Sequence, residues 1–339
     1  MRFKVDTSPF PGSGKSVGGL MWQVCAALVP GTLVALYVMG WGVLFNVLLA
    51  VAAGLAAEAL MLLLRGRPVR PFLSDGSVVL TGWLLGLCLP ALAPWWIPVV
   101  GMLFAVVVAK QLYGGLGYNL FNPAMVGYVV LLISFPREMT RWPIPQGELP
   151  GFGESLGIVF GAAPQAGWDS VTGATPLDAL RTVLSHEGVV QTALQGPAFG
   201  WLGGQGSEWV VLAFLAGGLW LLWRGVIRWH IPVAVLTSLL LVSGLFWLID
   251  PAHHASPLLH LFAGAAVFGA FFIATDPVTA STTVLGRLVF GAGIGLLIYL
   301  IRAFGGYPDG VAFAVLLMNL AVPLIDYYTR PRVFGHGRD

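Results

Sequence analysis

One short polar stretch of this chain gathers residue types that could do chemistry. It runs from Asp169 to Leu177, reads Asp-Ser-Val-Thr-Gly-Ala-Thr-Pro-Leu, and lies in a polar segment of about residues 136–208 between long apolar runs. Local rules predict a turn into a helix, with Thr175 as the N-cap, Pro176 as the first helical residue and Asp178 as a first-turn acid. This interpretation accounts for the local geometry. It does not explain why hydroxyl and carboxylate groups lie at this point of an apolar chain.

The composition limits what can hold this stretch. Of the 339 residues, 57% are hydrophobic and 9% are charged, and the mean hydropathy is +0.85. Soluble domains have about a quarter of their residues charged, so we expect a polytopic membrane protein embedded in a lipid bilayer. Apolar segments of this length predict an all-α fold, because a helix satisfies its own backbone polar groups in lipid. The formal net charge of +2 gives no indication of nucleic-acid binding.

About ten apolar segments are expected to be membrane helices, for which a full span needs about 20 residues. Five precede the polar segment and five follow it, which divides the chain into residues 1–135, 136–208 and 209–339. The expected helices cover about residues 20–39, 41–64, 77–89, 95–112, 123–135, 209–223, 231–249, 258–274, 284–301 and 310–325. An odd number of spans in each half would make any repeat inverted. We therefore expect two inverted five-helix halves with the working site between them.

The distribution of basic residues predicts the orientation, because cytoplasmic loops carry an excess of Lys and Arg. The loops on the side of the N-terminus hold Arg2, Lys4, Lys15, Arg65, Arg67, Arg70, Lys110, Arg224, Arg228, Arg287, Arg330, Arg332 and Arg338. The polar segment instead holds more acidic than basic residues. We therefore expect both termini in the cytoplasm and the 136–208 segment outside it, which is the periplasm for the inner membrane of a bacterium with two membranes.

Three polar clusters interrupt the apolar runs, all on the expected cytoplasmic side: Ser74 to Gly76, Tyr118 to Pro123, and Thr275 to Ser281. Non-helical backbone at membrane depth is tolerated where protein or a polar cavity surrounds it, and polar groups there often mark a cofactor or ion path. The alternative is that these residues only form caps and tight turns. As a second candidate site, for a flavin or an ion, we take five side chains of these clusters: Asp75, Asn119, Asn122, Asp276 and Thr279.

Other polar side chains have plainer interpretations. Glu58 could belong to an ion path together with Asn46, but near the end of its helix it is expected to snorkel or to pair with Arg65. His253 and His254 are adjacent and should point in different directions, which favours an interfacial loop over a metal site. The two cysteines of the chain are too few for an iron–sulfur cluster and are expected to be small buried residues.

Four motifs resemble those of one family of membrane subunits, found in the Rnf and Na⁺-pumping NADH:quinone reductase complexes. Residues 169–175 match the flavinylation signature Asp-x-x-(Ser/Thr)-Gly-Ala-Thr, and residues 118–124 and 275–278 are similar to two further segments of the family. Residues 8–10 resemble its Ser-Pro-His motif, with Phe10 in place of His, which puts any role of that histidine in doubt. The resemblance covers nearly the whole chain.

The resemblance implies a subunit of a complex that passes electrons between reduced ferredoxin and NAD, coupled to Na⁺ or H⁺ movement. This subunit would relay electrons through an FMN joined to Thr175 by a phosphoester bond, in a solvated loop away from the helix packing. Asp169 and Thr172 would serve recognition by the enzyme that attaches FMN. Gly173 and Ala174 would leave room for the phosphate, with Pro176 and Leu177 completing the site. The other subunits would be its partners, and relatives suggest a non-covalent riboflavin at the second candidate site.

A channel or small-solute transporter is the competing class. A chain with five spans on each side of a loop, and with polar interruptions in its helices, could hold a solute path. Such a protein would use the Asn and Asp clusters but would have no use for the Thr-Gly-Ala-Thr sequence. Detection of covalently bound flavin in the denatured protein would separate the two classes.

Overall fold

The structure is a computed structural model that describes residues 16–144, 149–165, 167–186 and 188–331. The first half of the chain is helical, with one short helix, α3 (Val69–Leu73), in the basic loop. Its other elements are α1 (Val17–Met39), α2 (Gly42–Leu64), α4 (Ser77–Cys88), α5 (Trp96–Leu103), the π-helix η1 (Phe104–Gln111) and α6 (Pro123–Ser134). Residues 8–10, the first three basic residues and the last two arginines lie outside the described residues.

The second half is also helical. Its elements are α12 (Ser207–Trp223), α13 (His230–Ile249), α14 (Pro257–Phe262), α15 (Ala266–Phe268), the π-helix η2 (Gly269–Ile273), α16 (Val284–Phe304) and α17 (Val311–Thr329). Among the described residues, five helices are long and apolar enough to cross a membrane: α1, α2, α13, α16 and α17. Shorter apolar helices accompany them. The chain is a mostly helical protein of the polytopic membrane type, whereas the count of ten spans remains a prediction.

The prediction of one continuous helix over residues 258–274 is wrong. The structure breaks it between α14 and α15, at residues 263–265. Gly264 has φ +142° there, and a Cβ on it would lie within 3 Å of Arg302, Leu177 and Asp309 side-chain atoms. Backbone in this conformation, crowded by three side chains, favours glycine. The expected helix over residues 95–112 is also modified, because its second part winds as the π-helix η1.

Helices from the two halves pack directly against each other. Helix α1 contacts α12, and α6 contacts α17. A Cβ on Gly217 of α12 would lie 2.2 Å from the Ala27 carbonyl oxygen of α1, so only glycine allows this approach of the two backbones. In each pair, the two helices have the same position within their own series of five expected spans. This pairing is compatible with an inverted repeat, which remains a prediction.

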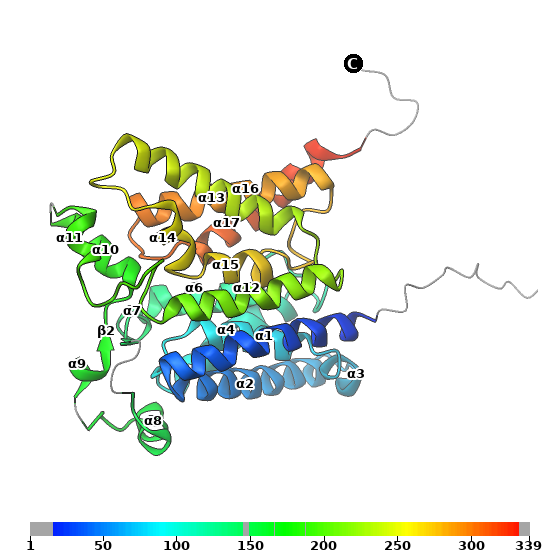
Figure 1. Ribbon diagram of the computed structural model, residues 1–339. Coiled ribbons are helices and arrows are strands. Elements are labelled where there is room, and N and C mark those ends of the chain that lie inside the picture. Colours follow the sequence, from blue (N-terminus) through cyan, green and yellow to red (C-terminus); the bar gives the residue numbers. More distant parts are fainter. Residues whose placement is uncertain (1–15, 145–148, 166, 187, 332–339) are drawn as a thin grey trace, which may run out of the picture.

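The segment between the halves contains short elements only. They are α7 (Pro136–Met139), β1 (Trp142–Pro143), α8 (Phe152–Val159), α9 (Trp168–Val171), β2 (Thr172–Gly173), α10 (Pro176–Ser185) and α11 (Val190–Leu194). Strands β1 and β2 pair antiparallel, with Trp142 opposite Gly173 and Pro143 opposite Thr172. Figure 1 shows α8 to α11 gathered at one end of the bundle, while α1 begins and α17 ends at the other. Which end faces the cytoplasm remains a prediction.

Candidate functional site

Thr175 occupies the N-cap of α10, as the sequence predicts. Its side-chain oxygen accepts a hydrogen bond from the Asp178 backbone N–H at 3.3 Å, and Pro176 is the first helical residue. Pro fits this position because its fixed φ suits the helix and the N–H it lacks would have no partner within the helix. Thr175 is partly exposed and the preceding Ala174 is exposed. The hydroxyl therefore lies at an accessible helix N-terminus.

Helix α10 is packed against the second half of the protein. Its buried face joins α11 and α14 in one cluster of buried apolar residues: Leu177, Leu180, Val190, Ala193, Ala255, Leu259 and Ala263. The Arg181 guanidinium donates a hydrogen bond to the Gly306 carbonyl, in the loop after α16. The expectation of a loop away from the helix packing is therefore wrong. The apolar face of α10 is therefore covered, while Thr175 at its N-terminus stays partly exposed.

The residues before Thr175 are held by a different set of contacts. The Thr172 hydroxyl donates a hydrogen bond to the Trp168 carbonyl at 2.7 Å and so closes the single turn of α9. The Arg141 guanidinium lies 4.4 Å from the centre of the Trp168 ring, within cation–π distance. Asp169 is exposed in the first turn of α9. Asp169 is therefore accessible to another protein, while Thr172 has a local structural partner.

Two features around Thr175 were missed by the sequence analysis. Pro176 packs closely against Gly204, because a Cβ added to Gly204 would lie 2.3 Å from the Pro176 Cγ. Glu208 holds the loop that contains Gly204, because its carboxylate accepts hydrogen bonds from the Trp201 and Leu202 backbone N–H groups at 2.8 and 3.0 Å. The loop before α12 therefore lies directly beside the start of α10. In the sequence, the glycines of this loop were the feature from which such close packing could have been predicted.

At the opposite end of the bundle, the structure brings part of the second candidate site together. The Asn122 backbone N–H donates to Asn319 Oδ1 at 3.1 Å, and Asn319 Nδ2 donates to the Thr279 carbonyl at 3.1 Å. The Thr279 hydroxyl donates to Asp276 Oδ2 at 3.0 Å. Asn122, Thr279 and Asn319 are buried. A polar network therefore joins α6, α17 and the loop after η2, which are parts of both halves.

The other two predicted residues have local partners. Asp75 Oδ1 accepts a hydrogen bond from the Ser77 backbone N–H at 2.7 Å, which is the turn chemistry named as the alternative. Asn119 Nδ2 donates to the Phe121 carbonyl at 3.2 Å. Asn319 was not predicted, although a single amide in the apolar run of α17 was a visible signal.

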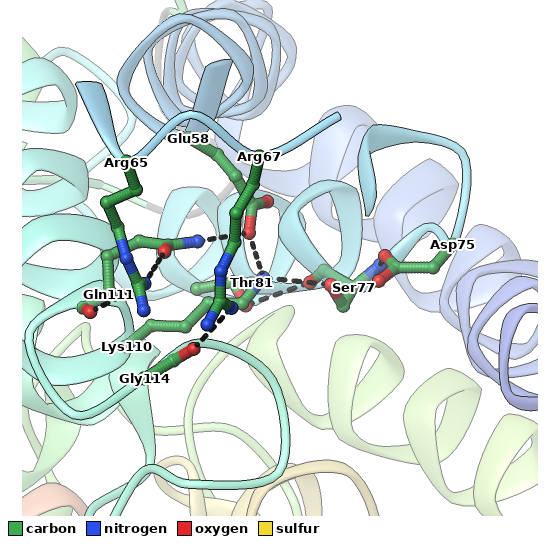
Figure 2. Close-up of polar contacts among 9 residues, drawn as sticks. All are labelled: Glu58, Arg65, Arg67, Asp75, Ser77, Thr81, Lys110, Gln111 and Gly114. Carbon is green, nitrogen blue, oxygen red and sulfur yellow. Dashed lines mark hydrogen bonds and ion pairs between the residues drawn. The ribbon is translucent and has the colours of Figure 1, made fainter. Parts of the chain in front are cut away.

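A second buried network lies in the first half, and Figure 2 shows its side chains converging from α2, α4 and η1. Lys110 Nζ lies 2.7 Å from Glu58 Oε1 and donates to Ser77 Oγ at 2.9 Å. Gln111 Nε2 donates to the same Glu58 oxygen at 2.9 Å. The exposed fractions of Glu58 and Lys110 are 1% and 2%. The expectation that Glu58 snorkels or pairs with Arg65 is therefore wrong, and Lys110 is an internal cation.

Arginines from the loop after α2 border this network. Arg65 Nη1 donates to Gln111 Oε1 at 2.8 Å and to the Gln111 carbonyl at 3.1 Å, while Arg67 Nη1 donates to the Gly114 carbonyl at 3.1 Å. Both arginines are visible above Gln111 in Figure 2. Arg65 therefore binds the last residue of η1, and Arg67 binds the loop that follows it. Glu58 Oε2 is buried and has no hydrogen-bond partner among the described residues.

The remaining polar side chains have individual partners. The His253 and Asp250 side chains lie 2.8 Å apart, whereas His254 Nδ1 lies 3.0 Å from the Tyr299 hydroxyl. The adjacent histidines thus point to different partners, as expected. Within the part of the chain that the structure describes, no group of three or more His, Cys, Asp or Glu side chains is placed to hold a metal ion. Asn46 is buried and donates to the Pro90 carbonyl at 2.8 Å.

Comparison with known proteins gives a consistent result along the whole chain. The profile of the NQR2, RnfD, RnfE family matches residues 4–335. A protein of Cronobacter sakazakii, named as the D component of an ion-translocating oxidoreductase complex, is 54% identical over 99% of this chain and 100% of its own length. Proteins of the same name from Escherichia fergusonii and Escherichia coli are each 52% identical, over 99% of both chains.

Proposed function

The chain belongs to the NQR2, RnfD and RnfE family, and from this premise we propose that it is the membrane subunit of an Rnf-type ion-translocating oxidoreductase complex that relays electrons through an FMN esterified to Thr175. The observation that best supports this proposal is that the Thr175 hydroxyl lies at the accessible N-terminus of α10, a helix packed against the second half. The other subunits of the complex and a flavin-attaching enzyme are its proposed partners. The complex as a whole would move Na⁺ or H⁺.

The residues around Thr175 fit a phosphate ester. A phosphate at the start of α10 would face backbone N–H groups that have no partner within the helix, and the helix dipole stabilises negative charge there. Ala174 is exposed and offers a single methyl group, and Gly173 offers no side chain. The packed face of α10 keeps the attachment point in a fixed place relative to the second half.

Each residue of the motif has a separate task in this proposal. Thr175 holds the cofactor, whose isoalloxazine ring supplies the redox chemistry when bound. Exposed Asp169 is available for recognition by the attaching enzyme, and Thr172 keeps α9 and β2 in shape through its bond to the Trp168 carbonyl. Pro176 and Leu177 fix α10 against Gly204 and the buried cluster.

Replacement of Thr175 tests the attachment. Thr175→Ala removes the hydroxyl, so ultraviolet fluorescence of the denatured subunit in a gel should be lost, and the FMN-sized mass increase on the peptide that contains Thr175 should disappear. Thr172→Ala should keep both signals, at a reduced level if recognition is impaired. Covalent flavin in Thr175→Ala, or a modified Thr172 in the unaltered protein, would contradict the assignment.

The proposed orientation puts Thr175 in the periplasm and both termini in the cytoplasm. A reporter that is active only in the periplasm should be active when fused near Gln165 and silent when fused near Pro68, in the loop between α2 and α3. The reverse pattern would overturn the orientation without affecting the attachment chemistry, because the two experiments have separate readouts.

A second, non-covalent site is proposed at the network around Asn122, Asn319 and Asp276, for riboflavin or an ion. Its support is that this buried network joins elements of both halves. Asp75 and Asn119 have other partners, and their contribution to the site remains a prediction. Protein with Thr175→Ala should still release a dissociable flavin on denaturation, and flavin-free protein would argue against a riboflavin there.

A further inference from the structure

Helix α8 has two apolar faces, although it lies in the segment between the two halves. One face is buried and contains Ile158 and Val159. The other face is exposed and contains Phe152, Leu156 and Phe160, with exposed fractions of 52%, 38% and 58%. These three residues follow each other at a spacing of four, so they form a stripe along one side of the helix. A surface helix in water would be expected to place polar residues at these positions.

Aromatic contacts fix α8 at the level where α2 enters the apolar bundle. The Phe152 ring lies 5.3 Å from the Trp41 ring and 5.3 Å from the Phe45 ring, in edge-to-face geometry with both. Trp41 is the N-cap of α2, and Phe45 is one turn further along this spanning helix. Phe152 therefore lies at the depth of the first turn of α2, within about one helical pitch of its end.

The other end of α8 is held at the same level. The Val159 carbonyl accepts a hydrogen bond from the Trp95 backbone N–H at 2.9 Å, directly before α5 begins. Trp41 and Trp95 are both exposed, at 41% and 44%. Tryptophan at the end of a spanning helix is typical of the membrane–water interface. Helix α8 thus contacts the beginning of α2 and the residue directly before α5, and a tryptophan lies at each of these two places.

The charge distribution agrees with contact to lipid. Glu154 is the only charged residue of α8, and its carboxylate accepts a hydrogen bond from the Gln165 backbone N–H at 3.1 Å. The exposed stripe itself carries no charge, and α2, which Phe152 contacts, also has exposed apolar residues such as Leu48. Figure 1 shows α8 at the outer edge of the bundle, beside the end of α2, and not above its centre.

We propose that α8 is an interfacial helix, whose stripe of Phe152, Leu156 and Phe160 is inserted among the lipids at the end of the bundle that carries the 136–208 segment. Such a helix lies in the plane of the membrane with its apolar face about 5–10 Å into the boundary between headgroups and acyl chains. Its opposite face packs through Ile158 against Leu92 and Val171. Val171 directly precedes the Thr172–Thr175 motif, so the interfacial helix and the motif belong to one packed unit.

Spin-label accessibility tests this proposal in the assembled complex, in nanodiscs of phosphatidylethanolamine and phosphatidylglycerol. Labels are placed at Leu156→Cys and Phe160→Cys in a Cys25→Ala/Cys88→Ala background. The matched control is Asp169→Cys, which is exposed on α9 in the same segment. Collisions with oxygen, which is enriched in the bilayer, are compared with collisions with water-soluble Ni(II)EDDA. Both α8 labels should favour oxygen, and the control label should favour Ni(II)EDDA.

The other outcomes overturn the proposal. If the α8 labels collide with Ni(II)EDDA as readily as the control does, the stripe faces water. If they are shielded from both reagents, another subunit covers the stripe. The same labels in the isolated chain then identify that subunit contact, because removal of the partner would restore the collisions. Since the labelled positions are exposed, the substitutions should leave folding intact, which the thermal unfolding temperature of each variant checks.

Discussion

The two polar regions of this protein are held by opposite means. The Glu58–Lys110 network is buried between helices of the first half, and its hydrogen bonds join residues more than 30 positions apart. The Thr172–Thr175 motif is partly exposed, and its own hydrogen bonds join residues three or four positions apart. In the first region the fold depends on each polar group. In the second region, the packed helix α10 holds the motif in place and leaves the Thr175 hydroxyl partly exposed.

This difference has an energetic reason. A charge inside the bundle is stable only with its partner, so removal of one member leaves the other unpaired and costly. An exposed hydroxyl at a helix N-terminus can be replaced by water at little cost. We therefore expect substitutions in the buried network to affect stability first, and substitutions in the motif to affect the cofactor first.

The largest effect on stability is expected for Glu58→Ala. It leaves the Lys110 ammonium buried without its carboxylate, which costs about 3–5 kcal/mol for a buried pair. The free energy of unfolding, measured by steric trapping in a membrane mimetic, should fall by this amount. The double variant Glu58→Met/Lys110→Met should recover most of the loss, because both charges are absent. Equal instability of the single and double variants would show that charge burial is not the cause.

A smaller loss is expected for Asn319→Leu. The substitution leaves the buried Asn122 N–H and the Thr279 carbonyl without this partner, and an unsatisfied buried group costs about 1–3 kcal/mol. The thermal unfolding temperature should decrease accordingly. Leu320→Val, at a neighbouring position with an exposed fraction of 68%, is the control and should have little effect. An unchanged unfolding temperature in Asn319→Leu would mean that the network does not hold the two halves together.

At Thr175, the effect on stability should be small although the cofactor is lost completely. Thr175→Ala removes the N-cap of α10, which costs about 1 kcal/mol. Thr175→Asn should restore the cap but still cannot form the phosphoester, so it should combine normal stability with the absence of covalent FMN. Unfolding and in-gel fluorescence measured on the same samples separate the two properties. A large destabilisation in Thr175→Asn would show that the attachment itself supports the fold.

The smallest effect is expected at Asp250, after α13. The hydrogen bond from His253 lowers the pKa of this exposed carboxyl below its ordinary value of 3.8. Its stabilising contribution is therefore complete above that ordinary pKa and is lost as the pH falls through the lowered value. Hydrogen exchange at the Ala252 and His253 amides, both bonded to Asp250, should lose protection at acidic pH after correction for the intrinsic rate. Asp250→Asn should remove that pH dependence.

The sequence predicted the motif better than its surroundings. The N-cap role of Thr175 follows from local chemistry among neighbouring residues, and the structure confirms it. The docking of α10 on α14 depends on contacts between residues far apart in the chain, which no local pattern contains. The pairing of Glu58 with Lys110 was missed for the same reason, since Arg65 was the nearer cation in the sequence.

For the fold, long apolar runs were enough to place the main helices. Hydropathy reports burial in lipid but not backbone geometry, so it could not show the break at Gly264 or the π-helical winding of η1 and η2. The break at Gly264 depends on side chains far apart in the sequence, such as Arg302 and Leu177, which occupy the space around its backbone. Asn319 could have been noted as a polar residue in an apolar run, but its partners Asn122 and Thr279 could not.

The β1–β2 pair and the docked α10 have a joint mechanical consequence. Strand β1 follows α6 and α7. The pairing of β1 with β2 therefore ties β2 to the segment that directly follows the helices of the first half. Helix α10 is instead fixed to α14 and to the loop after α16. Between these two anchors lie only Ala174 and Thr175. Any rocking of one half against the other would have to be taken up at these two residues, so Thr175, which is joined to the second half through α10, would shift relative to β2.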